Sequence, residues 1–176
     1  TINLAYAKYP HDEDRLQKIF REVKLSDYGA RNTIMQMDKD LTNFKRDRHK
    51  LEYVDYFNDF LESKNPPELK YLFIDEAQDL SAHQWMVVDM IQKVSKPIET
   101  YVAGDDDQAI FRWAGADIEH FIAMANNDAN TIIPLTQSYR VPKSVHTLAT
   151  KMAQSISNRI DKQYNPRDDE GERKVL

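Results

Sequence analysis

Two groups of acidic side chains follow apolar segments of the chain, and these are the residues best suited to chemistry. Asp75 and Glu76 come directly after the apolar stretch Leu72–Ile74. Asp105–Asp107 follow a second apolar stretch, which ends at Ala103. Carboxylates at the end of a strand can face a metal or a phosphate, although they are also common as helix caps and in solvated turns. If the two strands are parallel neighbours, both groups lie at the same edge of the sheet and form one site.

Each side chain in this expected site has its own chemical capacity. Mg²⁺ accepts one or two carboxylates together with substrate phosphates, so Asp75 is a candidate direct or water-mediated ligand. Glu76, the next residue, points elsewhere and can accept a proton from an attacking water. Gln108 follows the second acidic group and offers an uncharged donor and acceptor to a terminal phosphate. This combination is typical of Mg²⁺-dependent phosphate chemistry.

The elements that position these residues are a helical first third and then alternating strands and helices. Helical spacing of apolar residues predicts three early helices, around Leu16–Val23, Ile34–Phe44 and Tyr53–Leu61. Apolar runs predict strands at 69–75, 98–103 and 131–135, and the first of them should be covered on both faces.

Helices are expected between and after these strands. The spacing of Ser81 and Gln84 is that of a capping box. Short helical pieces are expected around 107–112 and 117–125, and Pro142 suits the first position of a helix to about 156. The order predicts an α/β fold with a parallel sheet and ligands at the carboxyl ends of its strands.

Composition narrows the class of protein. With 176 residues, 41% of them apolar, the chain can form one full core or two small ones. The net charge of −5 does not by itself indicate a nucleic-acid binder, although a local basic groove is compatible with it. Cysteine is absent, which excludes disulfides and thiolate metal sites, and the five histidines lack ligand spacing. Without a long apolar run or a leader sequence, we expect a soluble, intracellular, cytoplasmic protein with no membrane partner.

Three ordered motifs resemble the UvrD/Rep branch of superfamily-one DNA helicases. They are Leu72–Asp79 (LFIDEAQD), Val102–Ala116 (VAGDDDQAIFRWAGA) and Leu135–Arg140 (LTQSYR), and they are similar to motifs II, III and IV of that family. The resemblance covers residues 69–150.

The resemblance implies a RecA-like parallel sheet, as in the motor domain of a P-loop NTPase. Residues 68–134 would form part of that domain. Residues 1–67 look like the family's small inserted helical subdomain, by position alone, and residues 135–176 would begin the second motor domain or a connecting helix.

The resemblance also implies individual roles at the nucleotide. Asp75 would hold Mg²⁺, Glu76 would activate the hydrolytic water, and Gln108 would contact the γ-phosphate of ATP and couple it to DNA. Arg140 would act as an arginine finger and Tyr139 would stack on the adenine. Without the resemblance, Arg140 reads equally well as part of a surface ion pair.

At the DNA, Phe111 and Trp113 would stack on bases of the single strand, whereas composition alone favours a place in the core. The chain departs from the family at Ser138, where asparagine is common, and at Arg112, where glycine is frequent.

The motif G-x-x-x-x-G-K-[ST], which cradles nucleotide phosphates, does not occur, and the four glycines cannot supply it. We therefore expect an internal fragment, inactive alone, of an ATP-dependent helicase that translocates on single-stranded DNA and unwinds duplex junctions 3′ to 5′. The start at Thr1 and the strand-like end at Val175–Leu176 fit a fragment. The strand edge at 98–103 would be left unpaired and would favour self-association.

Two other classes of function remain open. Asp75, Glu76 and Asp105 could clamp two metal ions in a nuclease, which would cleave DNA with Mg²⁺ and without ATP. Alternatively, the chain could be a non-catalytic module that binds single-stranded DNA irrespective of nucleotide. The basic segment Lys45–Lys50 could contact backbone phosphates or could simply be a solvated helix end.

Overall fold

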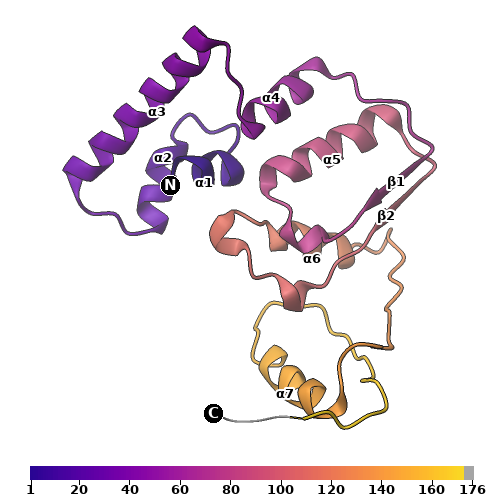
Figure 1. Ribbon diagram of the computed structural model, residues 1–176. Coiled ribbons are helices and arrows are strands. Elements are labelled where there is room, and N and C mark those ends of the chain that lie inside the picture. Colours follow the sequence, from indigo (N-terminus) through magenta and orange to yellow (C-terminus); the bar gives the residue numbers. More distant parts are fainter. Residues whose placement is uncertain (173–176) are drawn as a thin grey trace. The chain divides into compact units, whose positions relative to one another are not determined.

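The computed structural model describes residues 1–172, which form two compact units (Figure 1). Unit 1 comprises Thr1–Asp105 and Ala109–His120, and unit 2 comprises Asp106–Gln108 and the chain from Phe121 onward. The short turn Asp106–Gln108 therefore groups with unit 2, although its neighbours on both sides belong to unit 1. The strand expected at Val175–Leu176 lies outside the described residues.

Unit 1 begins with four helices: α1 (Ile2–Lys8), α2 (Arg15–Glu22), α3 (Tyr28–Arg48) and α4 (Tyr53–Ser63). The helices predicted from apolar spacing thus form as α2, α3 and α4. Helix α1 was not predicted. It packs on α2, and the two helices bury a small core made of Ala5, Leu16, Ile19 and Phe20.

Helix α3 forms as predicted, but none of its residues is buried. Only its first turns reach the small core, through Ile34 and Met35. Further along, the side chains of Met37 and Phe44 are 56% and 54% exposed. Near the end of the helix, the ammonium group of Lys45 pairs with Asp55 of α4 at 2.9 Å. This lysine of the basic segment therefore serves a contact within the chain.

The sheet of unit 1 consists of two parallel strands, β1 (Tyr71–Ile74) and β2 (Glu99–Val102), connected through α5 (Ala82–Ser95). Tyr71 pairs with Glu99 and Ile74 pairs with Val102, so both strands end at the same edge. Figure 1 shows α5 between the two strands in the chain path. Parallel pairing thus confirms the arrangement on which the expected site depends.

The predicted capping box at the start of α5 is confirmed. The Gln84 backbone N–H donates to the Ser81 hydroxyl at 3.3 Å, and the Ser81 N–H donates to the Gln84 side-chain oxygen at 2.8 Å. Two N–H groups that the helix itself cannot satisfy are thereby paired.

The expectation that β1 is covered on both faces is wrong. Tyr71 and Phe73 are 51% and 72% exposed, whereas Leu72 and Ile74 between them are half-buried. Phe73 stacks on Tyr101 of β2, with ring centroids 4.9 Å apart. The alternation recurs in β2, so other described residues cover only one face of the sheet.

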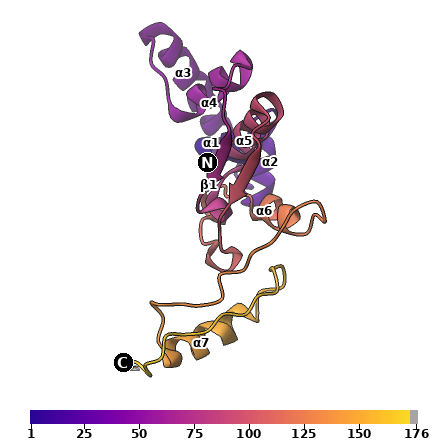
Figure 2. The same ribbon diagram turned by 90° about the vertical axis from the view of Figure 1, so that its right-hand side faces the viewer.

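Unit 2 contains the 3₁₀ turn Asp106–Gln108, the second part of α6 (Ile118–Ala125) and α7 (Lys143–Ala153). In Figure 2 the last described segment runs back along α7. Helix α7 confirms the predicted helix, with Pro142 at its N-cap rather than at its first helical position. No helix among residues 1–172 is both long and apolar enough to cross a membrane.

The strand expected near 131–135 does not form, and Ile133 and Leu135 are 77% and 90% exposed. A strand requires a neighbour that accepts its backbone hydrogen bonds. That pairing occurs slightly later, where the Ser138 N–H donates to the Asn165 carbonyl at 2.8 Å. Only an isolated bridge between Gln137 and Asn165 results.

Candidate nucleotide site

The turn after β1 presents Asp75 and Glu76 to solvent at the carboxyl edge of the sheet. Both side chains are exposed, and one Asp75 oxygen accepts the Glu76 N–H at 2.9 Å. Glu76 adopts a left-handed backbone conformation with φ of 50°. This conformation is uncommon for a non-glycine residue and carries some backbone strain. Lys24, His49, Lys64 and Lys96 also adopt it, the last three as C-caps of helices.

Gln78 connects the two strand ends, a role that the sequence did not reveal. Its side chain is 1% exposed and donates through Nε2 to a Glu76 oxygen at 2.7 Å. The Gln78 amide oxygen in turn accepts the Asp105 N–H at 3.0 Å. One buried amide thus fixes the Glu76 carboxylate relative to the end of β2. The only feature of the sequence that could have indicated this role is the position of the glutamine between Glu76 and Asp79.

Backbone hydrogen bonds hold the same two turns together. The Ala103 N–H donates to the Ile74 carbonyl at 2.8 Å, and the Ala77 N–H donates to the Ala103 carbonyl at 2.9 Å. The parallel pairing therefore continues past both strands, and it brings Asp75, Glu76 and Asp105 to one edge.

Asp79 lies at the back of this turn with one carboxylate oxygen buried and without a hydrogen-bond partner among the described residues. Burial, and secondly the negative charge of Glu76, raise the pKa of Asp79 above its ordinary value. Asp79 therefore takes up a proton more readily than an exposed aspartate does.

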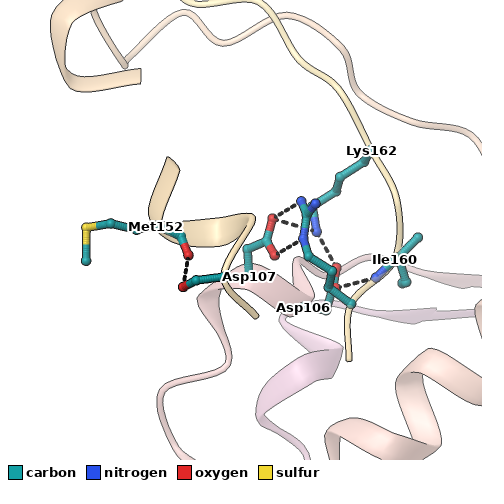
Figure 3. A network of polar contacts seen from close by, with 7 residues as sticks. Asp106, Asp107, Met152, Ile160 and Lys162 are labelled. Carbon is teal, nitrogen blue, oxygen red and sulfur yellow. Dashed lines mark hydrogen bonds and ion pairs between the residues drawn. The ribbon is translucent and has the colours of Figure 1, made fainter. Parts of the chain in front are cut away.

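Asp106 and Asp107 correct the expectation that all the acids form one site. Asp107 receives two hydrogen bonds from the Arg159 guanidinium, at 2.9 and 2.8 Å. Asp106 accepts the Ile160 N–H at 2.7 Å and pairs with Lys162, as Figure 3 shows. Both carboxylates pair with cations that lie far away in the sequence, and these cations neutralise charge that a metal ion would otherwise neutralise.

These partners also keep Asp107 ionised. The hydrogen bonds from Arg159, and then those from Lys162, lower the pKa of Asp107 in spite of its burial. The same contact raises the pKa of Arg159. The charge of the pair is therefore fixed across the range of neutral pH.

Phe111 and Trp113 lie outside the core, contrary to the reading from composition alone. Phe111 directly precedes the 3₁₀ turn Arg112–Ala114 and is 43% exposed. Trp113 lies within that turn and is 75% exposed. Their ring centroids are 6.4 Å apart and the planes are tilted by 50°. Two aromatic faces are thus available to solvent within one short segment. Arg112 itself forms an ion pair with Glu119.

Tyr139 and Arg140 lie in unit 2, in the segment before α7, and both are exposed. The Ser138 hydroxyl accepts the Val141 N–H at 3.1 Å and lies 3.4 Å from the Arg140 N–H. Ser138 thereby shapes this turn through its oxygen, as an asparagine side chain would. Within residues 1–172, no ion pair of the Arg140 guanidinium is found.

The donor set at the sheet edge fits one kind of metal site and not another. Among residues 1–172, no three His, Cys, Asp or Glu side chains gather closely enough to hold an ion. A two-metal clamp of Asp75, Glu76 and Asp105 therefore has no support from the geometry. One exposed carboxylate at the end of a strand does fit Mg²⁺ that is shared with substrate phosphates.

Comparison with known proteins supplies the family. The family described as UvrD/REP helicase N-terminal domain matches residues 11–129. The chain is 33% identical over 105 residues to the ATP-dependent DNA helicase PcrA of Bacillus subtilis, which covers 59% of this chain and 14% of that protein. PcrA of Staphylococcus aureus is 34% identical over 97 residues, covering 54% of this chain and 13% of that protein.

A third relative is the DNA helicase II of Rickettsia typhi, which is 32% identical over 114 residues, 60% of this chain and 17% of that protein. The chain thus spans a small part of the length of these relatives. The match to the N-terminal domain extends over most of the chain and includes both acidic turns. The chain therefore belongs to the UvrD/REP helicase family.

Proposed function

We propose that this chain is part of an ATP-dependent DNA helicase and carries the hydrolytic carboxylates of its motor. The observation that carries the proposal is the pair Asp75 and Glu76, exposed at the carboxyl edge of a parallel sheet, with Glu76 held in a strained conformation. In this proposal the sheet belongs to a RecA-like motor domain at 68–134, between a helical subdomain at 1–67 and the start of a second domain at 135–176.

The proposed roles of the residues follow from their chemistry. Asp75 contributes an oxygen to Mg²⁺, which neutralises phosphate charge when it is bound. Glu76 accepts the proton of the attacking water, and its orientation is fixed by the hydrogen bond from Gln78. Gln108 and Arg140 contact the γ-phosphate, where the guanidinium stabilises the charge of the transferred group.

The remaining contacts concern adenine and DNA. Tyr139 stacks on the adenine ring, which is consistent with its exposure of 86%. Phe111 and Trp113 stack on bases of single-stranded DNA, an interaction worth about 1–3 kcal/mol per base. Translocation proceeds 3′ to 5′ toward duplex junctions, and the helicase operates in the cytoplasm.

The test is single-stranded-DNA-stimulated ATP hydrolysis by the full-length helicase that carries this chain. We expect Glu76→Gln to lower the stimulated rate by a factor on the order of 10²–10⁴, because the proton of the water loses its acceptor. Glu62→Gln, the same change at an exposed residue of α4, is the matched control and should have no effect.

Two results would favour the other functions. DNA cleavage with Mg²⁺ and without ATP would indicate a nuclease, and binding of single-stranded DNA without any hydrolysis would indicate a non-catalytic module. The 176 residues alone should not hydrolyse ATP, because they contain no G-x-x-x-x-G-K-[ST] sequence to hold its phosphates.

Self-association of the 176-residue chain is also proposed. Within the described residues β2 has a strand on one side only, and the stacked Phe73 and Tyr101 are exposed beside it. Unpaired edges next to apolar faces recruit other chains. Sedimentation should show a concentration-dependent dimer or larger species, and a monomer at high concentration would contradict the proposal.

A further inference from the structure

Four charged side chains of unit 2 form a cluster to which the proposed hydrolysis assigns no task. Asp106 and Asp107 come from the turn that contains Gln108, and Arg159 and Lys162 come from the segment after α7. Asp107 and Arg159 are 52 residues apart in the sequence. Figure 3 shows the carboxylates and cations of the cluster facing one another.

The cluster is far more enclosed than the other ion pairs of unit 2. The side chains of Asp106 and Asp107 are 2% and 12% exposed, and those of Arg159 and Lys162 are 18% and 20% exposed. The pair Arg167–Asp169, by contrast, is 46% and 51% exposed. Burying charges is costly, so a cluster of this kind is better suited to fixing one geometry than to adding stability.

The contacts restrain the turn in both position and orientation. Arg159 bonds both oxygens of Asp107, and a planar two-point contact fixes the direction of the carboxylate. Asp106 is held by the Ile160 N–H at 2.7 Å and by Lys162, whose ammonium group also lies 3.1 Å from Asp107. Gln108 is the next residue in the same 3₁₀ turn, so its backbone is restrained by the same contacts.

We propose that Asp106, Asp107, Arg159 and Lys162 are positioning residues that attach the Gln108 turn to unit 2. The grouping of Asp106–Gln108 with unit 2, between neighbours that belong to unit 1, agrees with this. The backbone of Gln108 would then be held by contacts within unit 2. The inference rests on the role proposed above for Gln108 at the γ-phosphate.

The test is a double-mutant cycle in the full-length helicase, read as single-stranded-DNA-stimulated kcat. Arg159→Gln should lower kcat by about tenfold to a hundredfold, because a small misplacement of a catalytic group has an effect of that size. Gln108→Ala should lower kcat similarly. If Arg159 acts through Gln108, adding Arg159→Gln to Gln108→Ala should lower kcat no further.

Two further variants separate positioning from loss of folding. Arg159→Lys retains the charge but loses the two-point contact, so it should restore kcat only in part. Arg167→Gln removes an exposed ion pair of the same unit and should leave kcat unchanged. All variants should keep the wild-type circular dichroism spectrum at the assay temperature.

Several results would overturn the inference. Additive losses in the double variant would show that Arg159 acts independently of Gln108, and a wild-type kcat for Arg159→Gln would show that the cluster positions nothing. If Gln108→Ala has no effect while Glu76→Gln abolishes hydrolysis, this inference fails and the proposed function stands. If Glu76→Gln also has no effect, the proposed function fails first, and the inference fails with it.

Discussion

The turns after β1 and β2 are both acidic and both follow a strand of the same parallel sheet, yet their carboxylates have opposite surroundings. Asp75 and Glu76 are exposed, and Glu76 is oriented by backbone strain and by the uncharged Gln78. Asp106 and Asp107 are enclosed and neutralised by cations from distant sequence.

This difference shows that residue type and position at a sheet edge do not by themselves assign a chemical task. A carboxylate that must bind a metal or accept a proton has to keep its lone pairs available, and neutral neighbours allow that. A carboxylate paired with arginine or lysine has already given its lone pairs to them. The first turn therefore suits catalysis, and the second suits positioning.

The contrast between the two turns should be largest in the loss of local stability when one carboxylate of each turn is neutralised. In the 176-residue chain, Asp107→Asn should lower the local opening free energy at the Ile160 amide by about 2 kcal/mol, because Arg159 loses a charged partner. Glu76→Gln should change protection near β1 by less than about 0.5 kcal/mol, as expected for an exposed position. Hydrogen exchange at single amides measures both.

Asp169→Asn, which breaks an exposed ion pair of unit 2, is the control for this experiment. It should cost less than about 1 kcal/mol. Equal losses in Asp107→Asn and Asp169→Asn would mean that the enclosure of the cluster has no energetic consequence.

A smaller effect is expected from pH, and it should have opposite signs in the two turns. Because the pKa of Asp79 is raised in the folded state, its protonated form favours folding, and its contribution is lost as the pH rises through that raised pKa. Because the pKa of Asp107 is lowered, its contribution is present above the unfolded-state pKa and is lost as the pH falls through the lowered value.

Acidification from pH 6 should therefore first increase amide protection at Leu80, after correction for intrinsic exchange rates. Protection at Ile160 should fall only below about pH 4, the region of ordinary aspartate pKa values. Asp79→Asn should abolish the first change alone. A parallel loss of protection at both amides would remove the contrast between the turns.

The smallest of these effects concerns the capping box of α5, the helix that follows the first turn. Ser81→Ala removes one half of the capping box of α5 and should cost about 1 kcal/mol of unfolding free energy. Because this contact joins uncharged groups, the cost should be the same at low and high salt. Urea unfolding at two salt concentrations checks this, with Ser157→Ala, at an exposed serine for which no hydrogen bond is found within residues 1–172, as the control.

The parts of the structure that could be predicted from the sequence depend on local patterns. Helices α2, α4 and α5 follow from apolar spacing and from the pair Ser81 and Gln84, which lie within one turn of each other. The common edge of β1 and β2 also followed, because alternating strands and helices favour parallel pairing. The exposed Asp75 and Glu76 are a consequence of that arrangement.

The parts that could not be predicted depend on partners far away in the chain. Nothing near Asp107 indicates Arg159, and the buried position of Gln78 exists only once the two strands are paired. The apolar run at 131–135 has strand-like composition but no neighbour among the described residues, so its backbone stays irregular. Coverage of β1 likewise depends on what packs against it and not on its own residues.

The grouping of Asp106–Gln108 with unit 2 has a consequence for the connectivity of the molecule. The chain passes between the units at three junctions: 105–106, 108–109 and 120–121. A protease that cuts once within 109–120 would leave Asp107 on the first fragment and Arg159 on the second. Such a cut would split unit 2 between the two fragments, so neither fragment would contain the whole cluster. Domain boundaries inferred from native digestion would therefore miss this division of the chain.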